Sequence, residues 1–420
     1  MPIPLNRYLR LESLLDGLAS APDEREEPVC SPRPLRHILP LDDRALTRNW
    51  EVLRRHTSLD EQDEACLADE ETRASISAYA KNIENCVGTL KLPVGVAGPL
   101  RIEGLFARGE YYVPLATTEA ALVASYHRGS RLITAAGGCR AMLCDNAVTR
   151  APGFAFRNLA DARAFVQWAG KNFDNFQTQA ATRTRHGELV DMRITVEGNH
   201  VYLNMDYYTG EAAGQNMVTL ATKAILDWIE IHTPVRPVHV FVEANFSGDK
   251  KATFLSFTSV RGKKVTAEVS LPRELVRKYL HIDPEKMYKM WMMITMGGLM
   301  SGCVGSQAHC ANGLAALYLA TGQDAACVSE SSAGLLRMEI EKNGNLYTAL
   351  TLPNIIVGSV GGGTKLPSQS IGLKMLQLPR QGAAFALAEI CAAICLAGEI
   401  SIIGALAADH FAAAHERLAR

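Results

Sequence analysis

The chain has 420 residues, of which 48% are hydrophobic and 21% are charged, and its formal net charge is −1. This length predicts two or three domains that can bury a sizeable core. The near-neutral charge argues against a nucleic-acid partner, because such proteins carry a basic face.

The N-terminal segment MPIPLNRYLRLESLL lacks the basic residues and the long apolar run of a signal peptide. Two apolar stretches are candidates for membrane spans, but residues 290–306 run into Gln307, and residues 382–408 carry Glu389 and Glu399. Because charges are costly in lipid, we expect both stretches to be buried helices. The ten cysteines lack the spacing of a metal site. The sequence therefore predicts a cytoplasmic, metal-free protein with no membrane partner.

Residues 1–65 mix charged and apolar side chains and are predicted to form a helical N-terminal region. Residues 84–100 are rich in Gly and Pro, which predicts an ordered loop. The alternation of residues 111–116 predicts a strand. It ends at residues 117–118, two threonines that favour a helix start, so a helix is predicted over 118–136.

The stretch 151–242 has a pattern of its own. The predicted elements are a strand at 153–156, a helix over 160–176, a hairpin of strands 189–196 and 200–207, a helix over 214–232 and a strand at 239–243. The order β-α-β-β-α-β is that of a ferredoxin-like (split βαβ) unit. We expect 151–242 to be a domain inserted into a larger one that consists of residues 66–150 and 243–420.

A long helix is predicted to begin at Asp283, a capping residue followed by Pro284, and to run to about Thr321. Its length would be on the order of 55 Å. A methionine stripe lines it, and a helix that is apolar nearly all round is expected to be central and buried. The predicted fold class is α+β, a large domain around this helix with the inserted unit. The motif GxGxxG is absent, so the sequence does not support a Rossmann fold.

Polar clusters stand out in apolar or Gly-rich surroundings. They are Glu119, the turn 247–251, the segment 322–326, the histidines His410 and His415, and the loop 358–364. Each has an ordinary structural reading as a helix-terminal acid, a solvated turn, a capping acid, surface histidines or a glycine turn. Taken alone, none of them decides a function.

Together these blocks resemble one family in order and spacing, the 3-hydroxy-3-methylglutaryl-CoA (HMG-CoA) reductases. The matching blocks are ENCVGTLKLPVGVAGPL, PLATTEAALVASYHRGSR, GDKK, GQDAA, GSVGGGTKLPSQ and the ALAADH…H tail. The resemblance runs from about residue 75 to 420 and is closer to the eukaryotic and archaeal class. It implies NADPH-dependent reduction of an acyl-CoA thioester to a primary alcohol, with HMG-CoA giving mevalonate and free CoA.

The resemblance assigns catalytic roles to Glu119, Lys250, Asp324 and His415. Lys250 would stabilise negative charge on the carbonyl oxygen, with Asp324 and Glu119 beside it. Glu119 would be the proton source for the aldehyde step. His415 would protonate the departing CoA thiolate.

The resemblance also assigns binding residues. Those for NADPH are Arg131, Thr184, Arg185, Glu211, Gly214, Asn216 and Met217. Two arginines near one phosphate would favour NADPH over NADH. Those for the substrate are Arg150, Asp249, Lys251, Asn312, Glu84 and Asn85. In the family the active site is shared between subunits, which implies a homodimer or a homotetramer.

Several positions depart from the family pattern. A Met has become Gln215, and a Gln-Asn pair has become Cys327-Val328. A serine that contacts the substrate carboxylate is Glu243, and a lysine falls at Met292 or Met293. Glu243 would either repel a substrate carboxylate or pair with a nearby cation, Lys251 or Arg150. Two alternatives therefore stay open: the same chemistry on another acyl-CoA or a carrier-bound thioester, and a non-catalytic CoA- or nucleotide-binding homologue.

Overall fold

The computed structural model describes residues 41–184 and 186–408, and the chain divides into two compact units at residue 89. The described part of the first unit is helical. Its elements are α2 (Asp43–His56), α3 (Glu61–Leu67), α4 (Glu70–Ser75) and the 3-10 helix η1 (Ile76–Tyr79). Each α-helix begins after an aspartate that accepts backbone N–H groups of the first turn. Trp50 is buried at the centre of this unit, and its indole N–H donates to the Val87 carbonyl at 2.7 Å.

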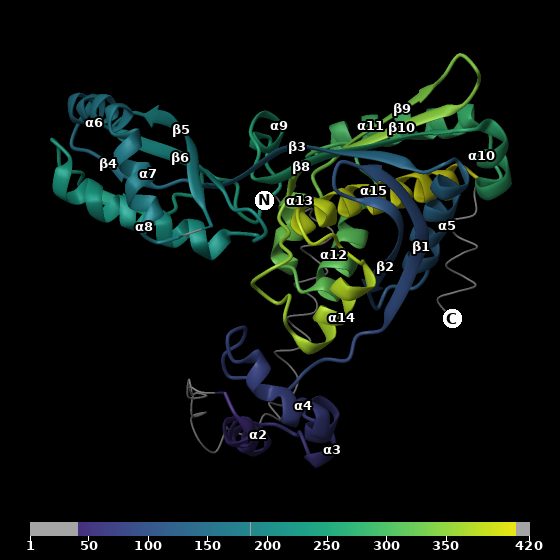
Figure 1. Cartoon of the computed structure of the whole chain (residues 1–420), viewed down its shortest axis with the longest axis horizontal. Helices are drawn as coiled ribbons and strands as arrows, with labels where there is room; N and C mark the ends of the chain where they lie inside the picture. Colours follow the sequence, from purple (N-terminus) through teal and green to yellow (C-terminus); the bar gives the residue numbers. More distant parts are fainter. Residues whose placement is uncertain (1–40, 185, 409–420) are drawn as a thin grey trace, which may run out of the picture. The chain divides into compact units, whose positions relative to one another are not determined.

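Within the described residues of the second unit, ten strands form one sheet (Figure 1). They are β1 (Val94–Gly104), β2 (Arg108–Ala116), β3 (Cys139–Arg150), β4 (Gly153–Ala155), β5 (Glu188–Glu197), β6 (His200–Tyr208), β7 (His239–Phe241), β8 (Gly262–Leu271), β9 (Leu335–Ile340) and β10 (Leu346–Ile355). The order is β7-β4-β6-β3-β8-β10-β9, with β1 beside β3, β2 beside β1 and β5 beside β6. All these pairings are antiparallel except β1 with β3.

The ferredoxin-like unit is confirmed. Its strands lie in the order β7-β4-β6-β5, and its helices are α6 (Leu159–Lys171), α7 (Phe173–Ala181) and α8 (Gln215–His232). It has an aromatic core of its own, in which Phe165 and Phe176 are fully buried. The helix predicted over 160–176 is in fact two helices that meet at Asn172. Strand β7 is shorter than predicted, and its three residues are exposed.

Strand β3 joins this unit to the rest of the sheet. Its first part pairs with β1 and β8, and its last three residues, Val148 to Arg150, pair with β6. In Figure 1 it runs as one strand between the two parts of the sheet. Arg150, at its end, therefore lies where the two parts meet.

The central buried helix of the second unit is α15 (Ala383–Ala407), as expected for residues 382–408. Among the described residues it is the one helix long and apolar enough to cross a membrane, but 89% of that stretch is buried inside the protein. Its two acids have backbone partners. Glu389 accepts N–H groups from Leu105, Phe106 and Ala107, and Glu399 accepts those of Ala308 and His309. Buried carboxylates are stable in a core when they are hydrogen-bonded in this way.

The single long helix predicted from Asp283 to Thr321 is wrong. The structure has two helices, α11 (Pro284–Ser301) and α12 (Cys310–Thr321). Gly302 ends α11 with a left-handed φ of 77°, the usual conformation of a residue that follows a helix C-terminus. The methionine stripe of α11 is buried at its start, where Met287 is 0% exposed, but exposed further on, where Met293 is 72% and Met300 is 84% exposed. An apolar helix in a sequence is expected to be covered, but the sequence does not show which element covers it. Here α15, and not α11, occupies the core.

Two further predictions change in detail. The last part of the loop expected over 84–100 belongs to strand β1, which spans Val94–Gly104. The helix expected from residue 118 is α5 (Leu122–Ala135), which starts later because Ala121 has a left-handed φ of 66° and no side chain caps the helix. Glu119 therefore lies in a turn after β2. The remaining elements are α9 (Leu255–Thr258), α10 (Arg273–Leu280), η2 (Ala325–Cys327), α13 (Val328–Ser331) and α14 (Pro367–Met375).

Candidate active site

Lys250 and Asp324 form the centre of the candidate site. The Lys250 Nζ lies 3.0 Å from the Asp324 Oδ2. Asp324 is the N-cap of η2, and its carboxylate also accepts the Ala326 N–H at 3.0 Å. The hydrogen bond with Asp324 outweighs desolvation and raises the pKa of Lys250. Burial acts to raise the pKa of Asp324, but the bonds from Lys250 and Ala326 hold it below its ordinary value. Both groups are therefore charged at neutral pH.

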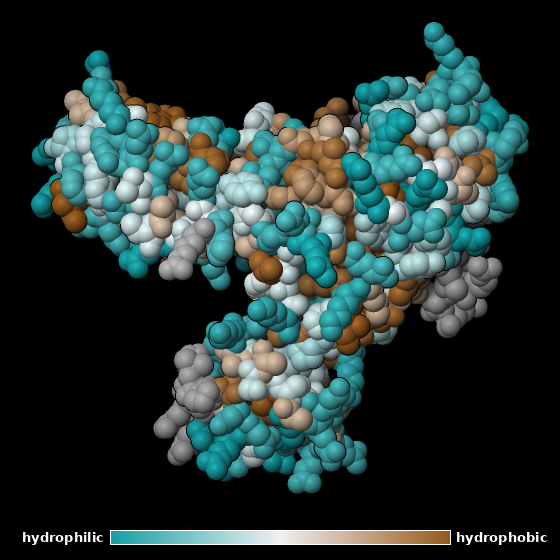
Figure 2. All heavy atoms as spheres, viewed as in Figure 1, coloured by the Kyte–Doolittle hydropathy of each residue, from teal (hydrophilic) through white to brown (hydrophobic). Residues whose placement is uncertain are grey.

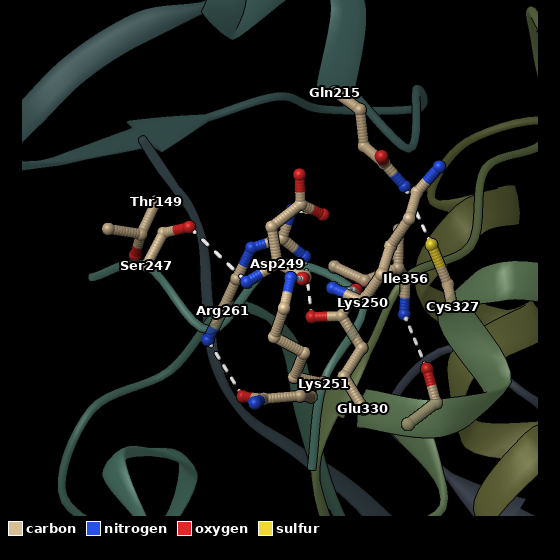
Figure 3. A network of polar contacts seen from close by, with 12 residues as sticks. Thr149, Gln215, Ser247, Asp249, Lys250, Lys251, Arg261, Cys327, Glu330 and Ile356 are labelled. Carbon is tan, nitrogen blue, oxygen red and sulfur yellow. Dashed lines mark hydrogen bonds and ion pairs between the residues drawn. The ribbon is translucent and has the colours of Figure 1, made fainter. Parts of the chain in front are cut away.

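Two buried arginines lie behind this pair. Arg150 Nη1 is 3.2 Å from Glu243 Oε2 and 3.1 Å from Asp249 Oδ2. Arg261 Nη2 is 2.6 Å from the other carboxylate oxygen of Asp249 (Figure 3). The Arg150 and Arg261 side chains are 7% and 3% exposed. Charges buried to this extent persist because each has an ionic partner.

Glu119 and Asn312 meet at a separate point. The Asn312 amide lies 3.2 and 3.1 Å from the two oxygens of the Glu119 carboxylate. Both residues line a pocket of about 370 Å³ whose other walls are mostly apolar. Val328 lines the same pocket and follows η2 directly, so the pocket extends toward the segment that carries Asp324. Within the described part of the chain, no hydrogen bond or ion pair joins Glu119 to Lys250.

The N-terminus of α8 carries several of the residues expected to bind the cofactor. Gly214 precedes the helix with a left-handed φ of 86°, and a Cβ there would lie 2.3 Å from Thr209 Cγ2. Only glycine fits this approach. No side chain caps the first turn of α8, which includes Asn216 and Met217. Its N–H groups are consequently available to an anion such as a phosphate.

Thr184 and Glu211 border this helix end. The Thr184 hydroxyl is 3.0 Å from Met217 Sδ and accepts the Gly187 N–H. Glu211 Oε2 accepts the Ser359 hydroxyl at 2.6 Å and the Ala384 N–H at 2.8 Å. Glu211 thus connects the α8 region to the glycine loop 358–364 and to the start of α15.

The other expected site residues lie elsewhere or outside the described residues. Arg131, on α5, is exposed with its guanidinium 6.0 Å from the ring of Tyr279 on α10. Arg185, His410 and His415 lie outside the described residues. Glu84 and Asn85 are exposed residues of the first compact unit, so they are described apart from this site.

Gln215, Cys327 and Glu243, which depart from the family pattern, lie in the site, whereas Met292 and Met293 lie on α11 and are exposed. The Gln215 amide is 2.7 Å from the Cys327 thiol (Figure 3). Of the two partners considered for Glu243, the structure pairs it with Arg150, while the Lys251 amine donates to the Asp249 carbonyl at 2.9 Å. Glu243 also accepts the Ser247 hydroxyl at 3.1 Å.

Arg261 and Glu330 belong to the site but were not expected there. Glu330 is fully buried and pairs with Arg261 at 2.5 Å. The only sequence signal was an acid within the small-residue run 329–334, and a single acid in such a run is usually a capping or surface residue. Arg261 follows an apolar segment that gave no indication of function.

Comparisons with known proteins agree with this architecture. A family model described as hydroxymethylglutaryl-coenzyme A reductase matches residues 48–420. The 3-hydroxy-3-methylglutaryl-coenzyme A reductase of Pyrococcus horikoshii is 41% identical over 348 residues, which cover 81% of this chain and 84% of that protein. The enzyme of the same name from Haloferax volcanii is 42% identical over 344 residues, or 80% of this chain and 85% of that one.

A solved structure shows the same fold. The class II reductase of Streptococcus pneumoniae, bound to NADPH in open conformations, superposes with a TM-score of 0.64 at 19% identity. The superposition covers 83% of this chain and 98% of that one. From the family model and the archaeal relatives, the chain belongs to the hydroxymethylglutaryl-coenzyme A reductase family.

Proposed function

We propose that this protein catalyses the NADPH-dependent four-electron reduction of HMG-CoA to mevalonate, with release of CoA. The observation that carries the proposal is the ion pair of Lys250 with Asp324, 3.0 Å apart, next to the buried ion pairs of Arg150 and Arg261. A lysine kept protonated by its partner is the cation that reduction of a carbonyl requires. Family membership supplies the substrate and the reaction.

Lys250 acts on the carbonyl oxygen in both reductions. NADPH, when bound, supplies the hydride for each of them. The Lys250 ammonium stabilises the negative charge that develops on the oxygen, first of the thioester and then of the aldehyde. Because Asp324 raises the pKa of Lys250, the amine keeps its proton at neutral pH.

Two other side chains handle protons in this proposal. Glu119 protonates the alkoxide of the aldehyde step, and its hydrogen bonds with Asn312 hold the carboxyl at the pocket. Collapse of the hemithioacetal releases CoA as a thiolate, and His415 protonates that sulfur. Each half-reaction therefore balances with one hydride and one proton.

The uncapped start of α8 is the proposed site for the pyrophosphate of NADPH. Gly214 allows a close approach, and the free N–H groups of the first turn attract the anion. Thr184 beside Met217 borders this position. Arg185 and Arg131 are the proposed partners of the 2′-phosphate, which would favour NADPH over NADH. For the substrate, Arg150, Asp249, Lys251, Asn312, Glu84 and Asn85 are the proposed contacts.

A homodimer or homotetramer in the cytoplasm is the proposed assembly. The exposed apolar face of α11 supports it, since Met293, Leu299 and Met300 are each more than two-thirds exposed. Contiguous apolar surfaces of this kind mark protein interfaces. On the face that Figure 2 shows, hydrophobic residues (brown) lie among hydrophilic ones (teal).

A second candidate is the same reduction of an acyl-CoA that lacks a free carboxylate. The pairing of Glu243 with Arg150 favours it, because this contact occupies a cation that a substrate carboxylate would use. A non-catalytic binding homologue is disfavoured, because the chain keeps the catalytic lysine and aspartate of the family pattern as Lys250 and Asp324, and the two side chains form an ion pair.

The test is NADPH oxidation over a panel of thioesters, namely HMG-CoA, acyl-CoAs without a second carboxylate and a carrier-bound acyl group. We expect turnover of HMG-CoA, and Lys250→Ala should abolish reduction of both the thioester and the free aldehyde. Lys278→Ala, an exposed lysine on α10, is the matched control and should keep full activity. If none of these thioesters causes NADPH to be oxidised, the proposal is refuted.

A further inference from the structure

Glu330 is a fully buried acid that contacts the turn carrying Lys250. It lies on α13, and its side chain is 0% exposed. One carboxylate oxygen, Oε1, accepts the backbone N–H of Lys250 at 3.2 Å (Figure 3). The other, Oε2, lies 2.5 Å from Arg261 Nη1. The carboxylate thus connects the backbone of the turn to a buried guanidinium.

Arg261 holds the same turn from a second direction. Its Nη2 lies 2.6 Å from Asp249 Oδ1, next to Lys250 in the sequence. Its own backbone N–H donates to Asn354 at 2.8 Å, which fixes it to the end of β10. Two consecutive residues of the turn are therefore held in place. Glu330 binds the backbone of Lys250, and Arg261 binds the side chain of Asp249.

The turn needs such support because its backbone is unfavourable. Lys250 has a left-handed φ of 58°, and Gly248 has a φ of 76°. A non-glycine residue in this region is strained and persists only where its surroundings hold it. Without an acceptor for its N–H, Lys250 would relax toward an ordinary backbone conformation, and its amine would leave Asp324.

We propose that Glu330 is a positioning residue that, together with Arg261, holds the backbone of Lys250 so that the Lys250 amine reaches Asp324. Its kinetic consequence rests on the reduction proposed above, but the geometry does not. Glu330 acts through Lys250 and contacts no reacting atom. The residue is a specific requirement of this site and not a packing residue.

The charge of Glu330 matters to this role. Burial raises the pKa of Glu330 to about 7, against the opposing effect of Arg261. The charged and titratable groups that face it are Arg261, Asp249, Lys250 and Cys327. A protonated Glu330 carboxyl no longer carries the negative charge that pairs with Arg261. Its contacts with Arg261 and with the backbone of Lys250 therefore weaken as the pH falls through about 7.

The kinetic test compares Glu330→Gln and Glu330→Asp with Ser329→Ala, an exposed neighbour on α13. Misplacing Lys250 should lower kcat of Glu330→Gln roughly ten- to a hundredfold, with a much smaller change in KM. We expect the wild-type kcat profile to have an acid limb near pH 7, and Glu330→Gln should lose it. Glu330→Asp keeps the charge and should recover part of kcat, and Ser329→Ala should match the wild type.

A second test needs no substrate. The pKa of the Lys250 amine is measured from the pH dependence of its acetylation by acetic anhydride, quantified by peptide mass spectrometry. We expect this pKa to fall in Glu330→Gln and in Arg261→Lys, because contact with Asp324 is what raises it. If either variant does not fold, Glu330→Asp and the remaining variant give the answer.

The outcomes separate the two proposals. A lower Lys250 pKa in the variants supports the positioning role, even if the wild-type protein reduces no thioester and the proposed function fails. An unchanged Lys250 pKa together with unchanged kcat and acid limb would overturn the role of Glu330, whatever the substrate proves to be.

Discussion

At the residue scale, Glu243 is the departure from the family pattern that bears most directly on the substrate, because an acid stands in place of a serine and pairs with Arg150. The Arg150 guanidinium lies between the carboxylates of Glu243 and Asp249. A substrate carboxylate would compete with Glu243 for the same cation and would meet its negative charge. The Nε of Arg150 and the Oε1 of Glu243 are buried without a partner among the described residues, so this pairing leaves capacity for a ligand.

Replacing Glu243 should therefore improve binding of a carboxylate-bearing substrate. We expect Glu243→Ser to lower KM for HMG-CoA by roughly tenfold, about the effect of one charge-assisted hydrogen bond. Steady-state kinetics measure it, with an acyl-CoA that lacks the second carboxylate as the control substrate. A micromolar KM for HMG-CoA in the wild type, with no lower KM in Glu243→Ser, would mean that Glu243 does not hinder binding of the substrate carboxylate.

Glu330 gives the stability of the protein a pH dependence of known sign. Burial raises its pKa from 4.5 to about 7, so between these values the folded state binds a proton more tightly than the unfolded state. The contribution of Glu330 to the free energy of unfolding therefore decreases as the pH rises through this window. The free energy of unfolding of the wild type minus that of Glu330→Gln should decrease as the pH rises from about 4.5 to about 7. Urea unfolding across this range measures it, and a constant difference would contradict the shift.

The sequence predicted only part of the site at this scale. Lys250 and Asp324 lie in short blocks that match the family, and the structure brings them into contact. Arg261 and Glu330 escaped notice because a buried ion pair between segments 69 residues apart leaves no local pattern. Pairing of Glu243 with Arg150 was one of two open alternatives, and only the fold could decide between them.

At the scale of elements, the strands and helices of the ferredoxin-like unit were predicted well because each has a clear period and turn residues at its ends. The error lay in helix α11. A continuous apolar run hid the break at Gly302, since a glycine inside a helical pattern can be either tolerated or a terminus. Apolarity also could not show that α15, and not α11, fills the core.

Helix α8 and the 3-10 helix η2 are coupled through two substituted positions. Gln215 donates to Cys327 at 2.7 Å, where the family pattern has Met and Gln. We expect Gln215→Met and Cys327→Gln to be harmful singly and to compensate together, with a coupling free energy of roughly 0.5–3 kcal/mol. A double-mutant cycle on kcat/KM for NADPH measures this coupling. Additive effects would show that the two exchanges are independent.

At the scale of the whole molecule, the exposed face of α11 is the clearest mark of an assembly. If this face is covered by another copy, Met300→Glu should shift the protein toward a smaller species, because it places a charge in an apolar interface. Met300 is 84% exposed and Ile231, on α8, is 78% exposed, so Ile231→Glu is a matched control. Sedimentation velocity distinguishes them. Equal sedimentation of the variant and the wild type would exclude α11 from the interface.

The proposed reaction transfers four electrons to one acyl group on a single enzyme. It is tested most directly by measuring, in one reaction with HMG-CoA, the NADPH oxidised, the CoA thiol released and the alcohol formed. Because Lys250 serves the oxygen in both steps, we expect two NADPH for each thiol and each alcohol. One NADPH for each thiol, with an aldehyde as the end product, would contradict the account.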